Sequence, residues 1–417
     1  MASKSATGKH SVSPFENEYI PPSYLPNLKK YKYSGADFSI ISRYVLQRYW
    51  NFVVSLVPMT VAPNRITFTG FLVGMSSTVV LLYYYFFENG EFPSWALYYA
   101  AFALFAYQTL DAIDGKQARR TGTGSPLGEL FDHGCDAFLT PFVMVNVTLA
   151  MYVEGPSRFW PLTLTCLGLF TAIWEQFSTG TFDLGYISGP TEGILVNCLL
   201  FIFSAIWKGS FWSVPVVGPY DIPYPASLSF LFPNSHGTVH VETGCDVLFS
   251  VFVLTCSTTA LVNIAHVIVR PSVHTSKLVP FLAALPIVLA SGLVLHIFVL
   301  YPDVQARFPF ALEVSYGLLL SITVTRLTIA RLCIMPYKLL HVYYVLYTAT
   351  LVTASAAHYF GDSFASRSTV ETTLGWSLVG LIVCATLQYA HMILTVFSQI
   401  SRYLNISIMT IGPKKNA

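Results

Sequence analysis

The sequence predicts an all-α integral membrane protein, with about ten transmembrane helices and an N-terminal amphipathic helix lying at the membrane interface. Three observations predict this fold class. Of the 417 residues, 54% are hydrophobic and only 11% are charged. Apolar runs close to the ~20 residues that cross a bilayer recur along the chain. Lys and Arg are also distributed unevenly among the segments that connect these runs.

The positions of the spans fix a topology. We expect spans near 66–87, 94–111, 137–153, 159–177, 194–211, 247–269, 279–300, 309–330, 339–357 and 373–398. Placing both termini in the cytosol leaves only Arg158, Lys208, Arg307 and Arg367, of 23 Lys and Arg, on the far side. This asymmetry is what the positive-inside rule requires. No charged-then-apolar leader precedes residue 38, so we expect no cleaved signal peptide.

The first element with a pattern follows a polar N-terminal segment, 1–37, and lies within 38–60. Its apolar stripe consists of Ile41, Val45, Tyr49, Phe52 and Leu56, and its polar stripe of Ser39, Arg43, Gln47 and Asn51. Such a helix is typical of the membrane interface. The alternative, a first transmembrane span, is less favoured because the polar stripe would face lipid.

The rest of the chain divides into three parts. We expect a catalytic core at 61–211, a lumenal loop at 212–246 that is rich in Pro, Gly and aromatic residues, and further helices at 247–417. Gly70 and Gly74 in the first span form a small-xxx-small pair, which indicates close packing against another helix. The net charge of +2 is too small to favour binding to nucleic acid.

Four aspartates stand out in a chain with so few charges, and the first two end the second span. If that helix continues to about Arg119, then Asp111, Asp114, Gly115 and Ala118 share one stripe, at i, i+3, i+4 and i+7. Gly115 costs about 1 kcal/mol relative to Ala inside a helix. A ligand that reaches the helix backbone would explain why Gly115 and Ala118 are small.

The second pair of aspartates lies on the next helix, after a loop with Gly and Pro. Gly128, Asp132 and Asp136 are four residues apart and form one stripe, and Glu129 and His133 form a neighbouring stripe. A short loop makes the two helices antiparallel neighbours, so we expect the stripes to face each other. Gly128 would then allow the helices to approach.

Four carboxylates close together repel one another unless a cation holds them. The usual cation is a divalent metal, and the usual chemistry beside two such ions is displacement at phosphorus. Ordinary capping charges at a solvated helix end would explain one or two of the aspartates, but not two stripes with small residues on the same faces. Asp111, Asp114, Asp132 and Asp136 are therefore the expected metal ligands.

The whole pattern, D-x2-D-G-x2-A-R-x8-G-x3-D-x3-D, resembles that of the CDP-alcohol phosphotransferase family and matches it at every position. FDHGCD (131–136), APNRIT (62–67) and SGPTEG (188–193) look like the eukaryotic choline and ethanolamine phosphotransferases of that family. The resemblance is specific mainly within 62–193.

The resemblance implies an enzyme that transfers phosphocholine or phosphoethanolamine from CDP-choline or CDP-ethanolamine to diacylglycerol. An alcohol hydroxyl would attack the β-phosphorus, and CMP would leave. It also implies Mg²⁺ or Mn²⁺ as cofactor, two ions in number, a homodimer, and an endoplasmic reticulum or Golgi location. Diacylglycerol should arrive laterally from the bilayer.

The resemblance also gives roles to single residues. Arg119 should contact the diphosphate, because its planar fork suits phosphate oxygens. Gly115, Ala118 and Gly128 should border the CDP moiety, and Asn64 is a further candidate from the first span, although Pro-Asn is also an ordinary helix start. The base is open between Asp136, by analogy with smaller family members, and His133. We favour His133 as base because a metal-bound carboxylate is weakly basic.

Headgroup selection is not determined by the sequence. Aromatic faces bind choline-like cations, and the candidates near the cytosolic ends of the fourth and fifth spans are Trp174, Glu175, Phe182, Tyr186 and Glu192. Ordinary interfacial aromatics and solvated carboxylates explain them equally well. Polar residues also occur inside the spans, and we expect helix-packing hydrogen bonds there. These are His266, His296, Glu313, Arg326 and His391.

Two competing functions remain. A polytopic transporter would place charges near the midplane of broken helices and carry internal repeats, whereas these charges cluster at one membrane surface. A phosphatidyltransferase that uses CDP-diacylglycerol, for example with inositol, would keep the family but change the substrates. The length of the chain and its FDHGCD sequence disfavour that alternative.

Overall fold

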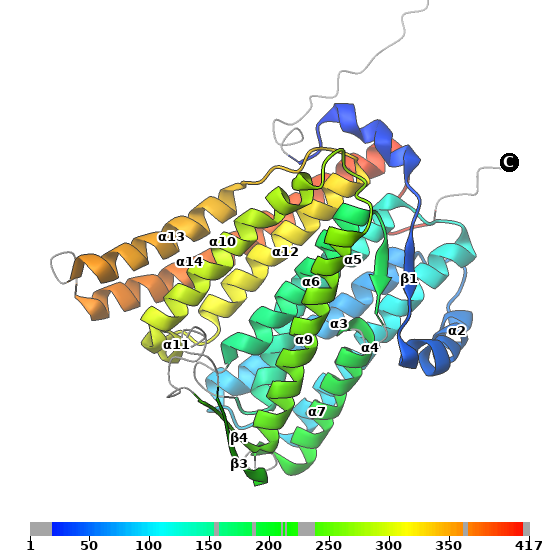
Figure 1. Ribbon diagram of the computed structural model, residues 1–417. Helices are drawn as coiled ribbons and strands as arrows, with labels where there is room; N and C mark the ends of the chain where they lie inside the picture. The colour runs from blue at the N-terminus through cyan, green and yellow to red at the C-terminus, as the bar shows by residue number, and fades with distance from the viewer. Residues whose placement is uncertain are drawn as a thin grey trace, which may run out of the picture.

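The computed structural model describes residues 19–153, 158–185, 189–209, 212, 215–223, 238–361 and 366–411, which form a helical bundle with two short sheets (Figure 1). The helices are η1 (Pro22–Lys30), η2 (Ser42–Leu46), α2 (Gln47–Leu56), α3 (Pro63–Phe87), α4 (Ser94–Thr121), α5 (Pro126–Ala150), α6 (Phe159–Thr179), η4 (Gly189–Gly193), α7 (Ile194–Trp207), α9 (Gly244–Val269), α10 (Leu278–Leu300), α11 (Pro302–Arg307), α12 (Ala311–Leu332), α13 (Val342–Phe360) and α14 (Arg367–Leu404). The strands are β1 (Gly35–Asp37), β2 (Phe182–Leu184), β3 (Pro215–Pro223) and β4 (Thr238–Thr243).

This architecture confirms an all-α membrane protein. Each expected span falls on one of the long helices from α3 to α14. By length and composition, six helical segments in the described part of the chain could cross a membrane: α3, η4 with α7, α9, α10, α12 and α14. The α4 helix, which continues into the charged motif and ends at Thr121, is not among them.

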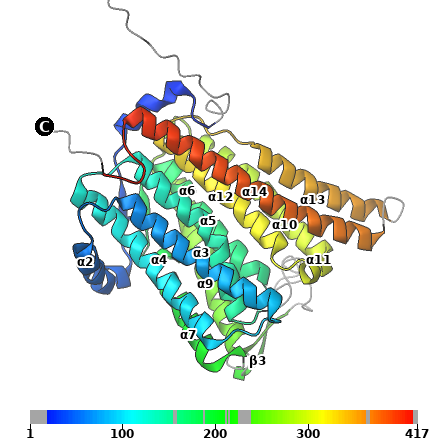
Figure 2. The ribbon, with the colours of Figure 1, turned by 180° about the vertical axis from the view of Figure 1, so that it is seen from behind.

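The centre of the bundle is α12, whose apolar window is completely buried. It packs against α5, α6 and α14, and the views from the front and from behind both show these helices next to α12 (Figures 1 and 2). The C-terminal part of the chain therefore supports the helix that carries Asp132 and Asp136.

Small residues allow the central helices to approach closely. A Cβ placed on Gly70 would lie 3.1 Å from the Leu110 Cβ of α4, and one on Gly74 would lie 2.8 Å from Cδ2 of Leu139 on α5. The small-xxx-small pair of α3 thus packs against both helices of the motif, which confirms the close packing predicted from the sequence. A glycine also allows close packing on α12, where a Cβ on Gly317 would lie 2.6 Å from the Pro141 Cβ of α5.

Replacing Gly317 with alanine should destabilise the protein by about 1–3 kcal/mol, because the rigid Pro141 ring leaves no room for the added methyl group. The free energy of unfolding can be measured by chemical denaturation in detergent. The matched control is Gly292→Ala on α10, where a Cβ would meet nothing within 4 Å. That control should be neutral or slightly stabilising; equal losses in both variants would contradict the packing argument.

The expected interfacial helix forms as η2 followed by α2, and α2 packs against α4 outside the main bundle (Figure 1). Val45, Phe52 and Leu56 of the expected apolar stripe are exposed, as membrane contact requires. A second apolar face, with Leu46 and Trp50, is buried against the protein. The five-residue π-helical turn of η2 shifts the register of the helix, and this explains why two apolar faces occur instead of one.

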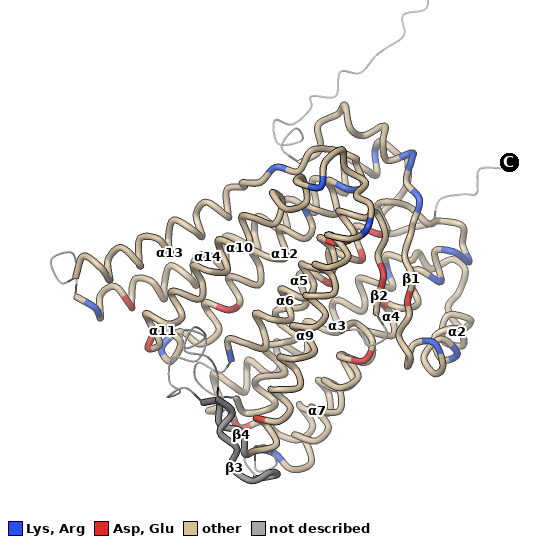
Figure 3. The backbone as a smooth tube through the Cα atoms, in the orientation of Figure 1, with Lys and Arg blue, Asp and Glu red and all other residues tan. Residues whose placement is uncertain are grey.

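A short pairing of strands brings the N-terminal segment to the motif. Strand β1 pairs in parallel with β2, with Gly35 opposite Phe182. Figure 3 shows that most Lys and Arg gather at this end of the bundle. In the expected lumenal loop, β3 and β4 pair antiparallel, while 213–214 and 224–237 lie outside the described residues.

Candidate active site

Local sequence signals set the two helix ends that carry the motif. The α4 helix ends where Gly122 adopts φ +70°, a left-handed conformation that glycine takes at no steric cost. The α5 helix begins at Pro126, and the Ser125 hydroxyl accepts a hydrogen bond of 3.1 Å from the Gly128 backbone N–H. Because proline is favoured in the first turn and serine at the cap, both boundaries follow from the residues themselves.

Three of the four aspartates form a compact cluster. One carboxylate oxygen from each of Asp111, Asp114 and Asp132 lies within 4.8 Å of the others. The Oδ1 atoms of Asp111 and Asp132 are buried and accept no hydrogen bond from the described residues. Buried, unsatisfied carboxylate oxygens are costly, and hard divalent cations such as Mg²⁺ prefer oxygen ligands. The donor set therefore fits a divalent metal.

The fourth aspartate lies at the edge of this cluster. Asp136 interacts with Asp111, and its carboxylate accepts a hydrogen bond from the Tyr107 hydroxyl. Asp114 likewise accepts a hydrogen bond from the Thr67 hydroxyl. Sequence reasoning missed both partners, although Tyr107 lies one turn before Asp111 on the same stripe. Thr67 closes the APNRIT sequence, and only its position on α3 reveals its role.

The structure corrects the expected arrangement of the two motif helices. The α4 helix packs chiefly against α3, and α5 packs about equally against α3 and α12, whereas α4 and α5 contact each other only weakly. A Cβ on Gly128 would lie 3.6 Å from the Ser125 Oγ and 3.7 Å from the Asn64 Oδ1, and it would meet no atom of α4. The prediction that Gly128 allows α4 and α5 to approach is therefore wrong. The two aspartate stripes come together because α4 and α5 both pack against α3.

The expected CDP contacts lie around this cluster. The exposed Arg119 folds back so that its Nη1 atom would lie 3.7 Å from a Cβ on Gly115. No other atom would lie within 4 Å of that Cβ. The surface over Gly115 and the neighbouring Ala118 is therefore open, with the Arg119 guanidinium at its border. Asn64 is buried, and its Nδ2 atom donates a hydrogen bond of 2.8 Å to the Ile408 carbonyl.

His133 is buried on α5 beside the cluster. Its ring lies 5.2 Å from the Phe182 ring of β2, centroid to centroid. Its Nδ1 atom has no hydrogen-bond partner among the described residues. The packing with Phe182 fixes the ring while leaving a nitrogen available, and this arrangement suits a group that accepts a proton.

Glu129, one turn before His133, is paired rather than solvated. Its Oε1 atom accepts hydrogen bonds from Arg331 of α12 and, at 3.1 Å, from Gln176 of α6. Burial and the Glu129 carboxylate together raise the pKa of Tyr31, which follows η1, so that its hydroxyl stays protonated. Arg331 is 202 positions away in sequence, which explains why no local signal predicted it.

Replacing Arg331 with alanine should cost about 3–5 kcal/mol of stability, because it leaves Glu129 as a buried carboxylate without its cation. The two side chains are 13% and 4% exposed, so solvent would compensate little. Chemical denaturation in detergent measures the loss. Arg48→Ala on the exposed face of α2 is the control and should change stability by less than about 0.5 kcal/mol; a similar small change at Arg331 would show that the pair contributes little.

Most of the candidate headgroup residues have structural partners. The Trp174 Nε1 atom donates to the Pro280 carbonyl at 2.7 Å. Glu175 pairs with His266 at 2.7 Å and Arg270 at 3.3 Å. Glu192 accepts hydrogen bonds from Ser39 and Ile41 and so anchors the start of the interfacial helix. Tyr186 lies outside the described residues, and Phe182 remains as the aromatic side chain beside His133.

The expected hydrogen bonds of polar residues within spans hold for the three histidines. His391 contacts Tyr19, His266 contacts Glu175 and His296 contacts Tyr359. The prediction does not hold for Glu313, whose Oε2 atom is buried without a partner in the described part of the chain.

Comparison with known proteins gives consistent results. Residues 60–181 match the family model described as CDP-alcohol phosphatidyltransferase. Choline/ethanolaminephosphotransferase 2 of Arabidopsis thaliana is 32% identical over 95% of this chain and 99% of its own length. Cholinephosphotransferase 1 of Saccharomyces cerevisiae is 28% identical over 95% and 99%, and that of Danio rerio is 40% identical over 46% and 51%. The similarity therefore extends well beyond the matched domain.

Proposed function

Because the chain belongs to the CDP-alcohol phosphatidyltransferase family, we propose that it transfers phosphocholine or phosphoethanolamine from the CDP-alcohol to diacylglycerol and releases CMP. The full-length relatives that bear these activities in their names support the reaction. The observation that carries the proposal within this chain is the cluster of Asp111, Asp114 and Asp132 at the end of the bundle rich in Lys and Arg.

The aspartates are the proposed metal ligands. Asp111, Asp114, Asp132 and Asp136 would hold Mg²⁺ or Mn²⁺, two ions in number. When bound, such ions neutralise the diphosphate of the donor and stabilise charge on the leaving CMP. The unsatisfied oxygens of Asp111 and Asp132 support this assignment. Thr67 and Tyr107 orient the other two carboxylates by their hydrogen bonds.

The donor would lie over the small residues of α4. Gly115 and Ala118 leave the helix backbone accessible, and Arg119 folds over them with a fork that suits phosphate oxygens. Gly128 and Asn64 border the opposite side. Diacylglycerol would reach the donor laterally from the bilayer.

His133 is the proposed base and Asp136 a ligand. The diacylglycerol hydroxyl oxygen forms a bond to the β-phosphorus, the bond between that phosphorus and the oxygen of CMP breaks, and His133 accepts the hydroxyl proton. The Nδ1 atom of His133, which has no partner in the described part of the chain, supports this role. The Tyr107 hydroxyl donates a hydrogen bond to Asp136 and orients that carboxylate as a ligand.

Other features of the proposal follow from the family resemblance. We expect a homodimer in the endoplasmic reticulum or Golgi membrane, with the active site and both termini in the cytosol. The concentration of Lys and Arg at the aspartate end supports the cytosolic orientation.

The reaction can be tested with the purified full chain in detergent. It should release CMP when given Mg²⁺, diacylglycerol and CDP-choline or CDP-ethanolamine, and the ratio of the two rates defines the headgroup preference. Removing the metal with EDTA should abolish release, and Mg²⁺ or Mn²⁺ should restore it. Release only from CDP-diacylglycerol with inositol would indicate the other branch of the family, and no CMP from any donor would favour a transporter.

A further inference from the structure

Arg326 is a buried cation without a partner among the described residues. It lies on α12, the central helix, and is only 9% exposed. The described residues give its guanidinium neither a hydrogen bond nor an ion pair, so the packing hydrogen bonds expected from the sequence do not form. A cation with so little exposed surface and no counter-charge is poorly solvated. A bound anion would compensate its charge.

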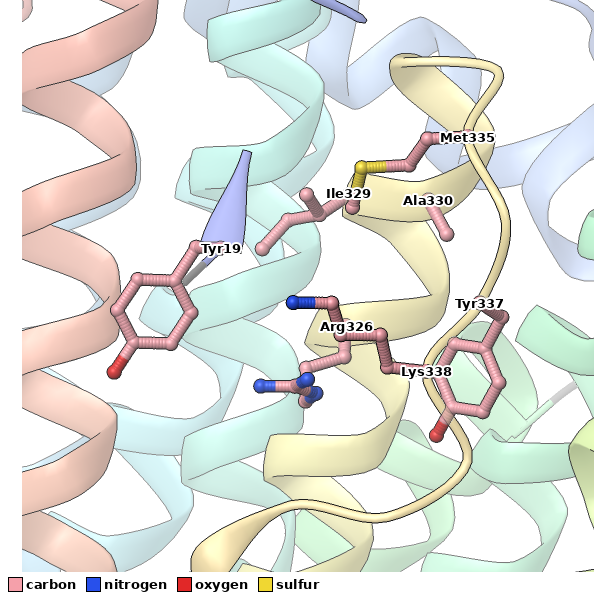
Figure 4. A pocket seen from close by; sticks show the side chains of 7 residues that line it. All are labelled: Tyr19, Arg326, Ile329, Ala330, Met335, Tyr337 and Lys338. Atoms are coloured by element: carbon pink, nitrogen blue, oxygen red, sulfur yellow. The ribbon is translucent and has the colours of Figure 1, made fainter. Parts of the chain in front are cut away.

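Two cavities meet at Arg326, and both are also lined by Lys338. The first contains Tyr19 and Tyr337, and Figure 4 shows the Arg326 and Lys338 side chains extending into it. The second has a volume of about 450 Å³ and lies beside the start of α13. Arg326 and Lys338 therefore form a pair of cations that lines both cavities.

Apart from His341, the remainder of the second cavity is lined by aliphatic side chains. Its lining includes Leu340, Val342, Val345 and Leu346, which are 49–62% exposed and continue along α13. A cavity with cations at one end and lipid-facing aliphatic side chains at the other matches the two parts of a phospholipid.

This cavity is separate from the candidate active site. Arg331 also belongs to α12, but five residues along an α-helix correspond to about 140° of rotation. Arg331 points to Glu129 of α5, whereas Arg326 points to the segment that leads into α13. The lipid substrate and the lipid product of the proposed reaction also lack the matching charge. Diacylglycerol carries no phosphate, and an ammonium group balances the phosphate of the product.

We propose that this cavity binds an anionic glycerophospholipid, with its phosphate on Arg326 and Lys338 and an acyl chain along α13. The proposal adds a second lipid site to the one that the reaction requires. The apolar lining selects a lipid over a soluble anion, and the buried guanidinium selects an anionic headgroup over a zwitterionic one.

Calorimetric titration of the purified full chain in detergent tests the site. The probes are short-chain phosphatidic acid, short-chain phosphatidylcholine, glycerol 3-phosphate and inorganic phosphate, all in EDTA so that the aspartate cluster holds no metal. Phosphatidic acid should bind most tightly. Arg326→Gln should weaken its binding at least about tenfold, because a charge-assisted hydrogen bond contributes about 1.5–3 kcal/mol.

Two further variants complete the test. Lys277→Gln removes an exposed cation just before α10 and should leave the binding unchanged. Leu346→Trp fills the apolar lining without changing charge and should weaken binding of phosphatidic acid while Arg326 is intact. Size-exclusion chromatography and thermal unfolding in detergent report whether each variant is folded.

Three results would overturn the proposal. The first is binding of phosphatidic acid by Arg326→Gln that is as tight as binding by the wild type. If Arg326→Gln does not fold, the same comparison is made with Leu346→Trp. The second is binding of glycerol 3-phosphate as tight as that of the lipid, which would indicate a soluble-anion site. The third is equal affinity for phosphatidylcholine. Because binding is measured without metal or CDP donor, none of these results depends on the proposed reaction.

Discussion

Replacing Asp111 with asparagine should lower CMP release by at least about a thousandfold. The substitution keeps the size of the side chain but removes the charge from a cluster whose oxygens lie within 4.8 Å of one another. Metal ions contribute several kcal/mol of transition-state stabilisation, and each 1.36 kcal/mol corresponds to tenfold in rate. The measurement is the initial rate of CMP release at saturating donor and diacylglycerol over a range of Mg²⁺ concentrations.

The control for this variant is Asp303→Asn, which removes an exposed carboxylate from α11 at the far end of the bundle. It should retain full activity. The Asp111 variant should also require more Mg²⁺ for its residual rate, since a ligand is missing. Activity within about threefold of wild type at the same Mg²⁺ concentration would rule out Asp111 as a metal ligand.

Replacing His133 with alanine should leave donor binding nearly intact but reduce turnover by about 10²–10⁴-fold, the range typical of a lost general base. The reason is positional. His133 lies beside the cluster and packs against Phe182, and its Nδ1 atom has no hydrogen-bond partner among the described residues. Donor binding is measured as the dissociation constant for CDP-choline with Mg²⁺ and without diacylglycerol, and turnover as CMP release.

Asp136→Asn distinguishes the two candidate bases. If Asp136 is a ligand, this variant should lose affinity for donor and metal together with activity. His296→Ala, whose ring contacts Tyr359 rather than the motif, is a control that should behave like wild type. The two roles would be exchanged by a pair of results. The His133 variant would be fully active, and the Asp136 variant would bind the donor but not release CMP; Asp136 would then be the base.

The motif illustrates how far sequence reasoning reaches. The spacing of Asp111, Asp114, Asp132 and Asp136 gave two carboxylate stripes, because helical periodicity relates residues three and four apart without reference to the rest of the chain. The structure retains both stripes. The way in which they meet was predicted wrongly, since a short loop does not specify which third helix the two will share.

The residues that contact the motif show the same limit of prediction from sequence. Tyr107 lies one turn from Asp111, so the stripe itself contained the signal. Arg331 and Phe182 come from segments with no periodic relation to α5, and only packing brings them beside Glu129 and His133. The headgroup candidates likewise resembled interfacial side chains until their hydrogen bonds were known.

By itself the sequence determined the membrane class, the positions of the long helices, the expected topology and the acidic motif with its small residues. Each depends on composition or on spacing within one helix, where backbone geometry alone sets the neighbours. Only the tertiary structure decided that α3 joins the motif helices, that α12 supplies the cation for Glu129, and that Arg326 has no counter-charge among the described residues. These outcomes depend on how side chains from distant segments fill a common interior, and close packing is a property of the assembled bundle rather than of any one segment.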